Sequence, residues 1–155
     1  MLAVGGALAA YFGASGVTKV LTAEISGIAP ALTTALALGV RIVYGRKTKP
    51  ITMPENVYVQ SAPSHTKGKD VQIMVSPEFL GADDKVLIVD DFLATGATIM
   101  ALVKLVQDAG ATVIGIGAVI EKAFEGGRAR LEAMGCPVRS LVVIERMNDN
   151  EIIFA

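Results

Sequence analysis

Residues 86–99 read VLIVDDFLATGATI, a run of β-forming residues followed by two adjacent carboxylates and a loop of small and hydroxyl-bearing residues. The short, continuously apolar run Val86–Val89 predicts a buried strand. The helical spacing of Thr98–Asp108, with Gly110 beyond it, predicts a helix directly after the loop. Ligands of parallel α/β sheets bind where the strands end. We therefore expect Asp90 and Asp91 to lie at a binding site.

The loop between this strand and this helix has the composition of an anion site. A glycine-containing turn at a helix N-terminus presents backbone N–H groups and the positive end of the helix dipole. The adjacent carboxylates of Asp90 and Asp91 are costly to desolvate together, so they need partners such as the hydroxyl groups of a sugar. The expected sugar-phosphate site therefore comprises the two aspartates and the loop residues Ala94, Thr95, Gly96, Ala97 and Thr98.

Two other interpretations of this stretch are less favoured. In the first, Thr98 only caps the helix and the aspartates are solvated, but a helix cap does not require two carboxylates before it. In the second, VLIVDD is the first strand of a response-regulator receiver domain, where an acidic pair binds magnesium. That domain needs a later strand with a phospho-acceptor aspartate, and the next strand, TVIGIGAVI, contains none.

Elsewhere the sequence alternates between strand and helix patterns. Strands are expected at 17–23, 41–44, 57–60, 71–75, 112–120, 138–144 and 152–154, and helices at 2–13, 28–38 and 127–134. This alternation predicts right-handed βαβ crossovers and an α/β fold with a mostly parallel, twisted sheet flanked by helices. The segments 57–60 and 71–75 are expected to pair as a hairpin. No repeat or linker divides the chain, so a single domain over 1–155 is expected.

The composition favours a cytoplasmic protein that binds neither nucleic acid nor membranes. Of 155 residues, 52% are hydrophobic, and the formal net charge of −1 provides no strongly basic surface. The N-terminal stretch MLAVGGALAAYFGASG lacks the basic start of a signal peptide and is too short and glycine-rich to span a membrane. The single cysteine, Cys136, excludes an intrachain disulfide and indicates a reducing compartment.

The stretch VLIVDDFLATGAT resembles the signature with which type I phosphoribosyltransferases bind 5-phosphoribosyl-1-pyrophosphate (PRPP). The xanthine branch of that family is similar in four segments, in the same order and spacing: LTAEISGIAPALTTALALGV (21–40), VYGRKTKPITM (43–53), VLIVDDFLATGAT (86–98) and GIGAVIEKAFEGGRARL (115–131). The resemblance covers nearly the whole chain. It implies the type I phosphoribosyltransferase fold, with a flexible loop or hairpin, and a purine-salvage enzyme. Such an enzyme converts a purine base and PRPP, with magnesium, to a nucleoside 5′-monophosphate and pyrophosphate.

The resemblance also implies which residues bind PRPP. The ribose C1 becomes oxocarbenium-like as pyrophosphate leaves, so the site positions its substrates and stabilises charge rather than supplying a nucleophile. Asp90 and Asp91 are implied as catalytic residues that contact the ribose hydroxyls or the magnesium-bound sugar, and Ala94–Thr98 as the cradle of the 5-phosphate. Pyrophosphate is implied to lie against the loop Glu24, Ile25, Ser26 and Gly27 and the cations Arg46 and Lys47.

For the purine base, the resemblance points to the segment after the strand 112–120. Lys122 matches the family lysine that donates to the purine oxo group, which favours xanthine and other 6-oxopurines over adenine. Phe124 is either a stacking partner of the base or a core residue. Glu121 is expected to pair with Arg128 or with Lys122.

Residues 61–69, SAPSHTKGK, match the flexible loop that closes over PRPP in this family. Within it, Lys67 or Lys69 is a better candidate for neutralising pyrophosphate than the single histidine, His65, is for acid–base catalysis. Magnesium is expected to bind mainly through PRPP oxygens and water, so no metal site built from protein ligands alone is expected.

Family members carry a further N-terminal segment that covers the base as a hood, and this sequence starts at the helix that follows it. We therefore expect the PRPP half of the site to be more complete than the base half. Two alternatives to an active transferase stay open: a PRPP-binding regulator, and a remnant with weak or no catalysis. Family members are commonly homodimers, and the apolar N-terminal helix favours self-association here too.

Overall fold

A six-stranded sheet forms the centre of the molecule, in the order β2-β1-β5-β6-β7-β8. The structure, a computed structural model, describes residues 1–63 and 70–155. The first five strands of this order are parallel, and β8 pairs antiparallel with β7. The strands are β1 (Lys19–Ala23), β2 (Arg41–Gly45), β5 (Lys85–Leu93), β6 (Thr112–Lys122), β7 (Val138–Met147) and β8 (Ile152–Phe154). The predicted α/β fold with a mostly parallel sheet is therefore confirmed.

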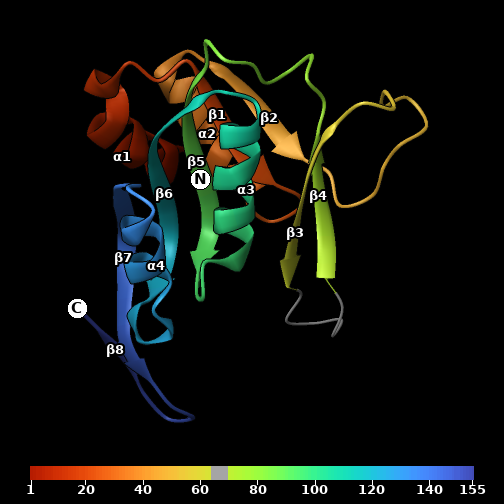
Figure 1. Cartoon of the computed structure of the whole chain (residues 1–155). Coiled ribbons are helices and arrows are strands. Elements are labelled where there is room, and N and C mark those ends of the chain that lie inside the picture. Colours follow the sequence, from red (N-terminus) through yellow and green to blue (C-terminus); the bar gives the residue numbers. More distant parts are fainter. Residues whose placement is uncertain (64–69) are drawn as a thin grey trace.

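Helices cover both faces of the sheet (Figure 1). On one face, α2 (Ile28–Leu38) packs over β1 and β5, and α1 (Leu2–Phe12) packs beside it over β6 and β7. The buried cluster on this face comprises Leu8, Phe12, Val20, Ala31, Ala35, Leu87 and Val89. On the other face, α3 (Ala97–Asp108) and α4 (Gly127–Ala133) bury Leu102, Leu105 and Leu131 in the larger cluster. Burial on both faces explains why the strand residues of β5 are continuously apolar up to Val89.

A separate two-stranded sheet consists of β3 (Tyr58–Pro63) and β4 (Asp70–Val75). The strands pair antiparallel, from Tyr58 opposite Val75 to Pro63 opposite Asp70, so the hairpin predicted for 57–60 and 71–75 is confirmed. The hairpin lies beside α3 (Figure 1), and Gln60 donates a hydrogen bond of 2.7 Å to Asp108 of that helix. A two-way backbone bridge between Arg46 and Met74 joins β4 to the end of β2.

Several strands extend further than the sequence pattern suggests. The strand predicted to end at Val89 continues to Leu93, because Asp90 pairs with Ala118 of β6 and Phe92 pairs with Ile120. β6 and β7 continue to Lys122 and Met147, and α3 begins at Ala97 rather than at Thr98. The two aspartates therefore lie within the last residues of a strand, not in the loop that follows it.

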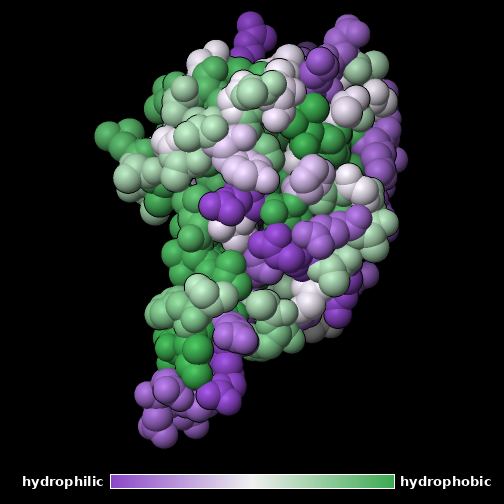
Figure 2. All heavy atoms as spheres, turned by 90° about the vertical axis from the view of Figure 1, so that its left-hand side faces the viewer, coloured by the Kyte–Doolittle hydropathy of each residue, from purple (hydrophilic) through white to green (hydrophobic). Residues whose placement is uncertain are grey.

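The β7–β8 hairpin projects from the body of the molecule (Figure 1). Its polar turn, Asn148-Asp149-Asn150-Glu151, forms the hydrophilic tip at the bottom of Figure 2. Apolar atoms gather above that tip, and Val142, Ile152 and Phe154 on the two strands are exposed. Among the described helices, none is long and apolar enough to cross a membrane.

Candidate active site

The candidate site lies at the carboxyl ends of four neighbouring strands, β2, β1, β5 and β6. Each expected segment follows or ends one of these strands: 24–27 after β1, 46–47 after β2, 90–98 at the end of β5, and 122–124 at the end of β6. Parallel strands bring their carboxyl ends to one edge of the sheet, which is where open α/β sheets bind ligands. The fold therefore gathers segments that are up to about a hundred residues apart in the sequence.

Asp90 and Asp91 have different environments although they are adjacent. Asp90 is 9% exposed, whereas Asp91 is half-buried, as alternation along a strand requires. Burial, together with the hydrogen bond and the negative charge of Asp91, raises the pKa of Asp90 to about 7. The Asp91 N–H, which donates to Asp90 Oδ1 at 3.0 Å, and the charge of Lys47 act in the opposite direction. Asp90 is thus a carboxylate that a nearby cation or hydroxyl donor would stabilise.

The loop after β1 packs directly against the two aspartates. Ser26 Oγ donates a hydrogen bond of 3.0 Å to Asp91 Oδ1. A Cβ atom on Gly27 would lie 2.8 Å from Asp90 Oδ1 and closer still to Thr22 Oγ1, so no larger residue fits there without a shift. The peptide bond between Glu24 and Ile25 is cis. The side chain of Ile25 is 80% exposed, so this loop is open to solvent at its tip.

Glu24 connects this loop to the predicted cations. Its Oε1 accepts a hydrogen bond of 2.6 Å from the Lys47 N–H, and its Oε2 lies 3.0 Å from Arg46 Nε. The second contact is an ion pair without hydrogen-bond geometry, since the buried Arg46 Nε forms no hydrogen bond among the described residues. The Arg46 guanidinium also lies 5.9 Å from the centre of the Tyr44 ring. Glu24 therefore positions the 46–47 segment as well as lining the β1 loop.

A cavity of about 100 Å³ lies at the junction of β5 and α3. It is lined by Asp90, Phe92, Ala94, Thr95, Gly96, Ala97, Thr98 and Ile99. Gly96, the N-cap residue of α3, has a φ of +79°, a conformation that glycine adopts readily. Thr98 lies inside the helix, so the alternative in which it serves as the helix cap is wrong. The aspartate and the loop expected to bind a sugar phosphate share one cavity.

Lys122 lies between two aromatic rings. Its Nζ is 5.3 Å from the centre of the Phe92 ring and 6.0 Å from that of Phe124, and it forms an ion pair of 3.6 Å with Glu125. Phe124 is 51% exposed, so it does not fill the core. Phe92 was not among the expected site residues, although an aromatic side chain directly after two carboxylates was an available signal. Phe92 also lines the cavity, and so it connects Lys122 to the sugar-phosphate segment.

A larger cavity, of about 400 Å³, is lined by Arg46, by β2 and by residues of the segments 50–54 and 75–79. It contains neither aspartate and none of the loop residues 94–98, so we do not place the sugar phosphate there. Residues 64–69, which include His65, Lys67 and Lys69, lie outside the described residues. In the part of the chain that is described, no group of three or more His, Cys, Asp and Glu side chains could hold a metal ion. The half-exposed Asp91 carboxylate fits an ion that is shared with substrate oxygens and water.

A family model described as a phosphoribosyl transferase domain matches residues 6–148. The chain belongs to the phosphoribosyltransferase family. This phosphoribosyltransferase is 50% identical over 146 residues to a xanthine phosphoribosyltransferase of Deinococcus deserti, a match that covers 94% of this chain and 76% of the relative. It is 44% identical over 154 residues to the xanthine phosphoribosyltransferase of Pseudomonas fluorescens strain Pf0-1, a match that covers 99% of this chain and 81% of that relative. The resemblance to the xanthine branch is therefore confirmed.

Solved structures of other phosphoribosyltransferases share the fold. Adenine phosphoribosyltransferase from Giardia lamblia, complexed with 9-deazaadenine, superimposes with a TM-score of 0.83 at 28% identity and covers 93% of this chain and 79% of its own. The enzyme from Thermoanaerobacter pseudethanolicus has a TM-score of 0.79 at 28% identity, with 91% and 78% covered. The adenine enzymes thus match the backbone, whereas the relatives with higher sequence identity are xanthine enzymes.

Proposed function

We propose that this phosphoribosyltransferase acts in purine salvage in the cytoplasm, transferring the phosphoribosyl group of PRPP to xanthine or a related 6-oxopurine. The observation that carries the proposal is the shared cavity of Asp90 and the loop Ala94–Thr98 at the end of β5. The identity of 43–50% to xanthine phosphoribosyltransferases over nearly the whole chain supports the choice of base. In the reaction, a ring nitrogen of the base bonds to the ribose C1, and pyrophosphate leaves with the electrons of the broken C1–O bond.

The β5 end of the site binds the ribose 5-phosphate. The backbone N–H groups at the start of α3 and the positive end of its dipole suit the 5-phosphate, which lies against residues 94–98. Asp90 and Asp91 accept hydrogen bonds from the ribose hydroxyls. As the C1–O bond breaks, the ribose becomes cationic, and the two negative charges stabilise it in a partly water-excluded site.

The β1 and β2 ends of the site bind the leaving pyrophosphate. The loop Glu24–Gly27 and the cations Arg46 and Lys47 are joined by the Glu24 contacts, so they act as one surface. A magnesium ion bound with PRPP would add positive charge next to the pyrophosphate. Arg46 offers the planar donor geometry that suits phosphate oxygens, and Lys47 adds a point charge.

The β6 end of the site reads the base. Lys122 carries three N–H donors and no acceptor, so it pairs with an oxo group and not with the amino group of adenine. The flanking rings of Phe92 and Phe124 offer faces on which a purine stacks. Lys122 is half-buried, so a base without the oxo group leaves its donors less well paired and binds more weakly.

A spectrophotometric assay tests the proposal. The protein is incubated with PRPP and magnesium and with each of xanthine, guanine, hypoxanthine, adenine, uracil and orotate. We expect turnover that is fastest with xanthine and absent with uracil and orotate. PRPP binding without turnover of any purine would refute the enzymatic proposal and leave a binding protein, and preferred turnover of adenine would refute the role of Lys122.

A further inference from the structure

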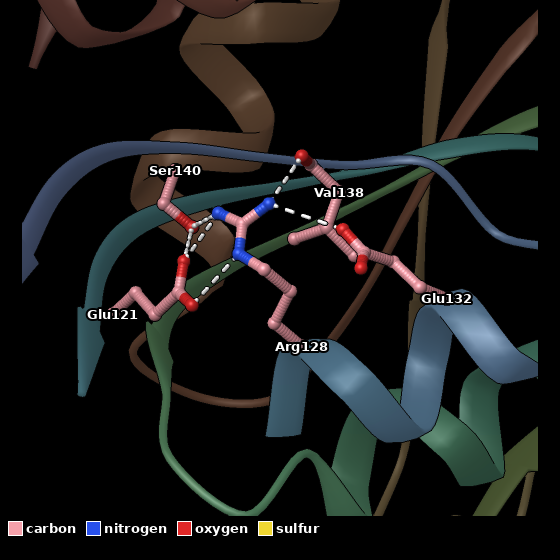
Figure 3. Close-up of polar contacts among 5 residues, drawn as sticks. All are labelled: Glu121, Arg128, Glu132, Val138 and Ser140. Atoms are coloured by element: carbon pink, nitrogen blue, oxygen red, sulfur yellow. Dashed lines mark hydrogen bonds and ion pairs between the residues drawn. The ribbon is translucent and has the colours of Figure 1, made fainter. Parts of the chain in front are cut away.

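Arg128 connects three elements beside the candidate site (Figure 3). Its guanidinium donates two hydrogen bonds to Glu121 at the end of β6, of 2.9 Å from Nε and 2.5 Å from Nη2. It also donates to Ser140 Oγ at 3.3 Å and to the Val138 carbonyl at 2.9 Å, both on β7. Arg128 itself belongs to α4, where Nη1 lies 3.4 Å from Glu132. One side chain therefore holds α4 against two strands.

The acceptor at the centre of this network is a buried carboxylate. Glu121 is 1% exposed, and Ser140 Oγ donates a further hydrogen bond of 2.5 Å to it. Burial raises the pKa of Glu121, but the hydrogen bonds from Arg128 and Ser140 lower it by more, so the carboxyl stays ionised at neutral pH. Such a buried charge requires its partner, because an unpaired carboxylate in this place is strongly destabilising.

Glu121 and Lys122 are consecutive residues of β6, and their side chains point to opposite faces of the sheet. Glu121 contacts Arg128 and Ser140, whereas Lys122 contacts the rings of Phe92 and Phe124. The two hydrogen bonds from Arg128 to Glu121 therefore fix the backbone from which Lys122 projects. The turn Ala123–Glu125, which carries Phe124, connects this end of β6 to α4.

The same end of α4 is bonded to the loop expected to bind the 5-phosphate. The N–H of Gly127, next to Arg128, donates to the Ala94 carbonyl at 3.1 Å. Arg130 Nη1 donates to the Thr95 carbonyl at 2.9 Å. A Cβ atom on Gly127 would lie 2.9 Å from Gly96 N, so the helix and the loop are in close contact. The start of α4 thus lies between the base-reading turn and the phosphate loop.

We propose that Arg128 is a positioning residue that sets Lys122 and Phe124 at a fixed place relative to the phosphate loop Ala94–Thr98, and so controls how well the site reads the base. The proposal rests on the proposed function, since it assumes that Lys122 contacts the base. Arg128 itself does not contact the substrate. Lysine retains its charge but cannot form the two parallel bonds to Glu121, so Arg128→Lys is the informative variant.

Calorimetric titration with two ligands tests this role without requiring turnover. Xanthosine 5′-monophosphate and ribose 5-phosphate differ by the base alone, so the ratio of their Kd values measures what the base adds. We expect Arg128→Lys to reduce that ratio about tenfold and to leave the Kd of ribose 5-phosphate nearly unchanged. If Arg128 only stabilised the fold, the variant would have a smaller fraction of binding-competent protein for both ligands alike, and the ratio of the two Kd values would not change.

Two further variants complete the experiment. Arg139→Lys, on β7 beside Tyr11, is a matched control and should leave both Kd values unchanged. In a Lys122→Met background, Arg128→Lys should change the ratio no further, because the group that it positions is gone. An unchanged ratio in Arg128→Lys, or a full additional loss in the Lys122→Met background, would overturn the inference alone. A wild-type protein that binds both ligands equally would overturn the proposed function as well.

Discussion

Asp90 illustrates how a functional residue acts against stability. Its pKa is raised to about 7 by burial and by Asp91, so ionising it costs the folded protein more than the unfolded chain. The folded protein retains the Asp90 proton to a higher pH than the unfolded chain does. By proton linkage, this carboxyl therefore lowers the free energy of unfolding as the pH rises from about 4 to about 7. A site that needs two adjacent carboxylates accepts that cost, because a substrate that binds them restores the favourable interactions.

The variant Asp90→Asn should therefore be more stable than the wild type at pH 8, by about 2–4 kcal/mol. Near pH 4 the two proteins should have nearly equal stability, because Asp90 is protonated there. The same variant should lose turnover by about a hundredfold or more. Urea unfolding at both pH values measures the first effect, and initial rates measure the second.

Asp83→Asn is the control for this experiment, because it removes the same charge from an exposed position. Its stability should follow that of the wild type at both pH values. If the stability difference between Asp90→Asn and the wild type were the same at pH 8 as at pH 4, the Asp90 carboxyl would not be desolvated as the structure indicates.

At the scale of elements, the contact between α1 and α2 depends on one glycine. A Cβ atom on Gly5 would lie 2.7 Å from Thr33 Cβ and closer still to the Thr33 backbone, whereas a Cβ atom on Gly6 would meet nothing within 4 Å. Gly5→Ala should therefore destabilise the protein by about 1–3 kcal/mol, because the helices must move apart. Gly6→Ala should stabilise it by about 0.5–1 kcal/mol through helix propensity.

Chemical denaturation of the two glycine variants side by side provides the measurement. Both replace glycine by alanine in the same helix, so intrinsic propensity is common to both and the difference reports the packing of α1 on α2. Equal shifts of the unfolding midpoint for the two variants would contradict this packing.

Most elements of the fold were predictable from the sequence, because the apolar patterns alternate between strand and helix periods. The strand ends were not. The apolar run predicts a strand that ends at Val89, before the two charges, yet Asp90 and Phe92 are also paired with β6. Local patterns do not contain the pairing register, which depends on the neighbouring strand.

The candidate site was predictable to a similar degree. The residue types of 90–98 and their place after a buried strand were enough to indicate a sugar phosphate. The link from Glu24 to Arg46, the position of Lys122 over Phe92 and the bonds from α4 to the phosphate loop join distant segments, so only the folded chain reveals them. The folded chain also reveals that Glu121 pairs with Arg128 and not with Lys122.

At the scale of the whole molecule, large apolar side chains are exposed on α1, on α2 and in the loop between β1 and α2. They are Leu2, Ile25, Leu32 and Leu36, with exposed fractions of 79, 80, 43 and 66%. Exposed apolar surface of this kind is typical of interfaces between chains. We propose that the protein is a homodimer, and we expect sedimentation equilibrium to give twice the chain mass of 16.1 kDa. A single species of one chain mass at micromolar concentration would refute the dimer.

We propose that the end of β5 and the start of α3 together bind ribose 5-phosphate. Calorimetric titration of PRPP, with and without magnesium, tests it most directly when the wild type is compared with Thr98→Val and Lys104→Gln. Thr98 lines the cavity, and its hydroxyl is expected to donate to the phosphate, whereas Lys104 is exposed further along α3.

We predict saturable PRPP binding that requires magnesium, an affinity about tenfold weaker in Thr98→Val, and no change in Lys104→Gln. A protein without magnesium-dependent affinity for PRPP, or a Thr98→Val variant that binds it as tightly as the wild type, would contradict the account.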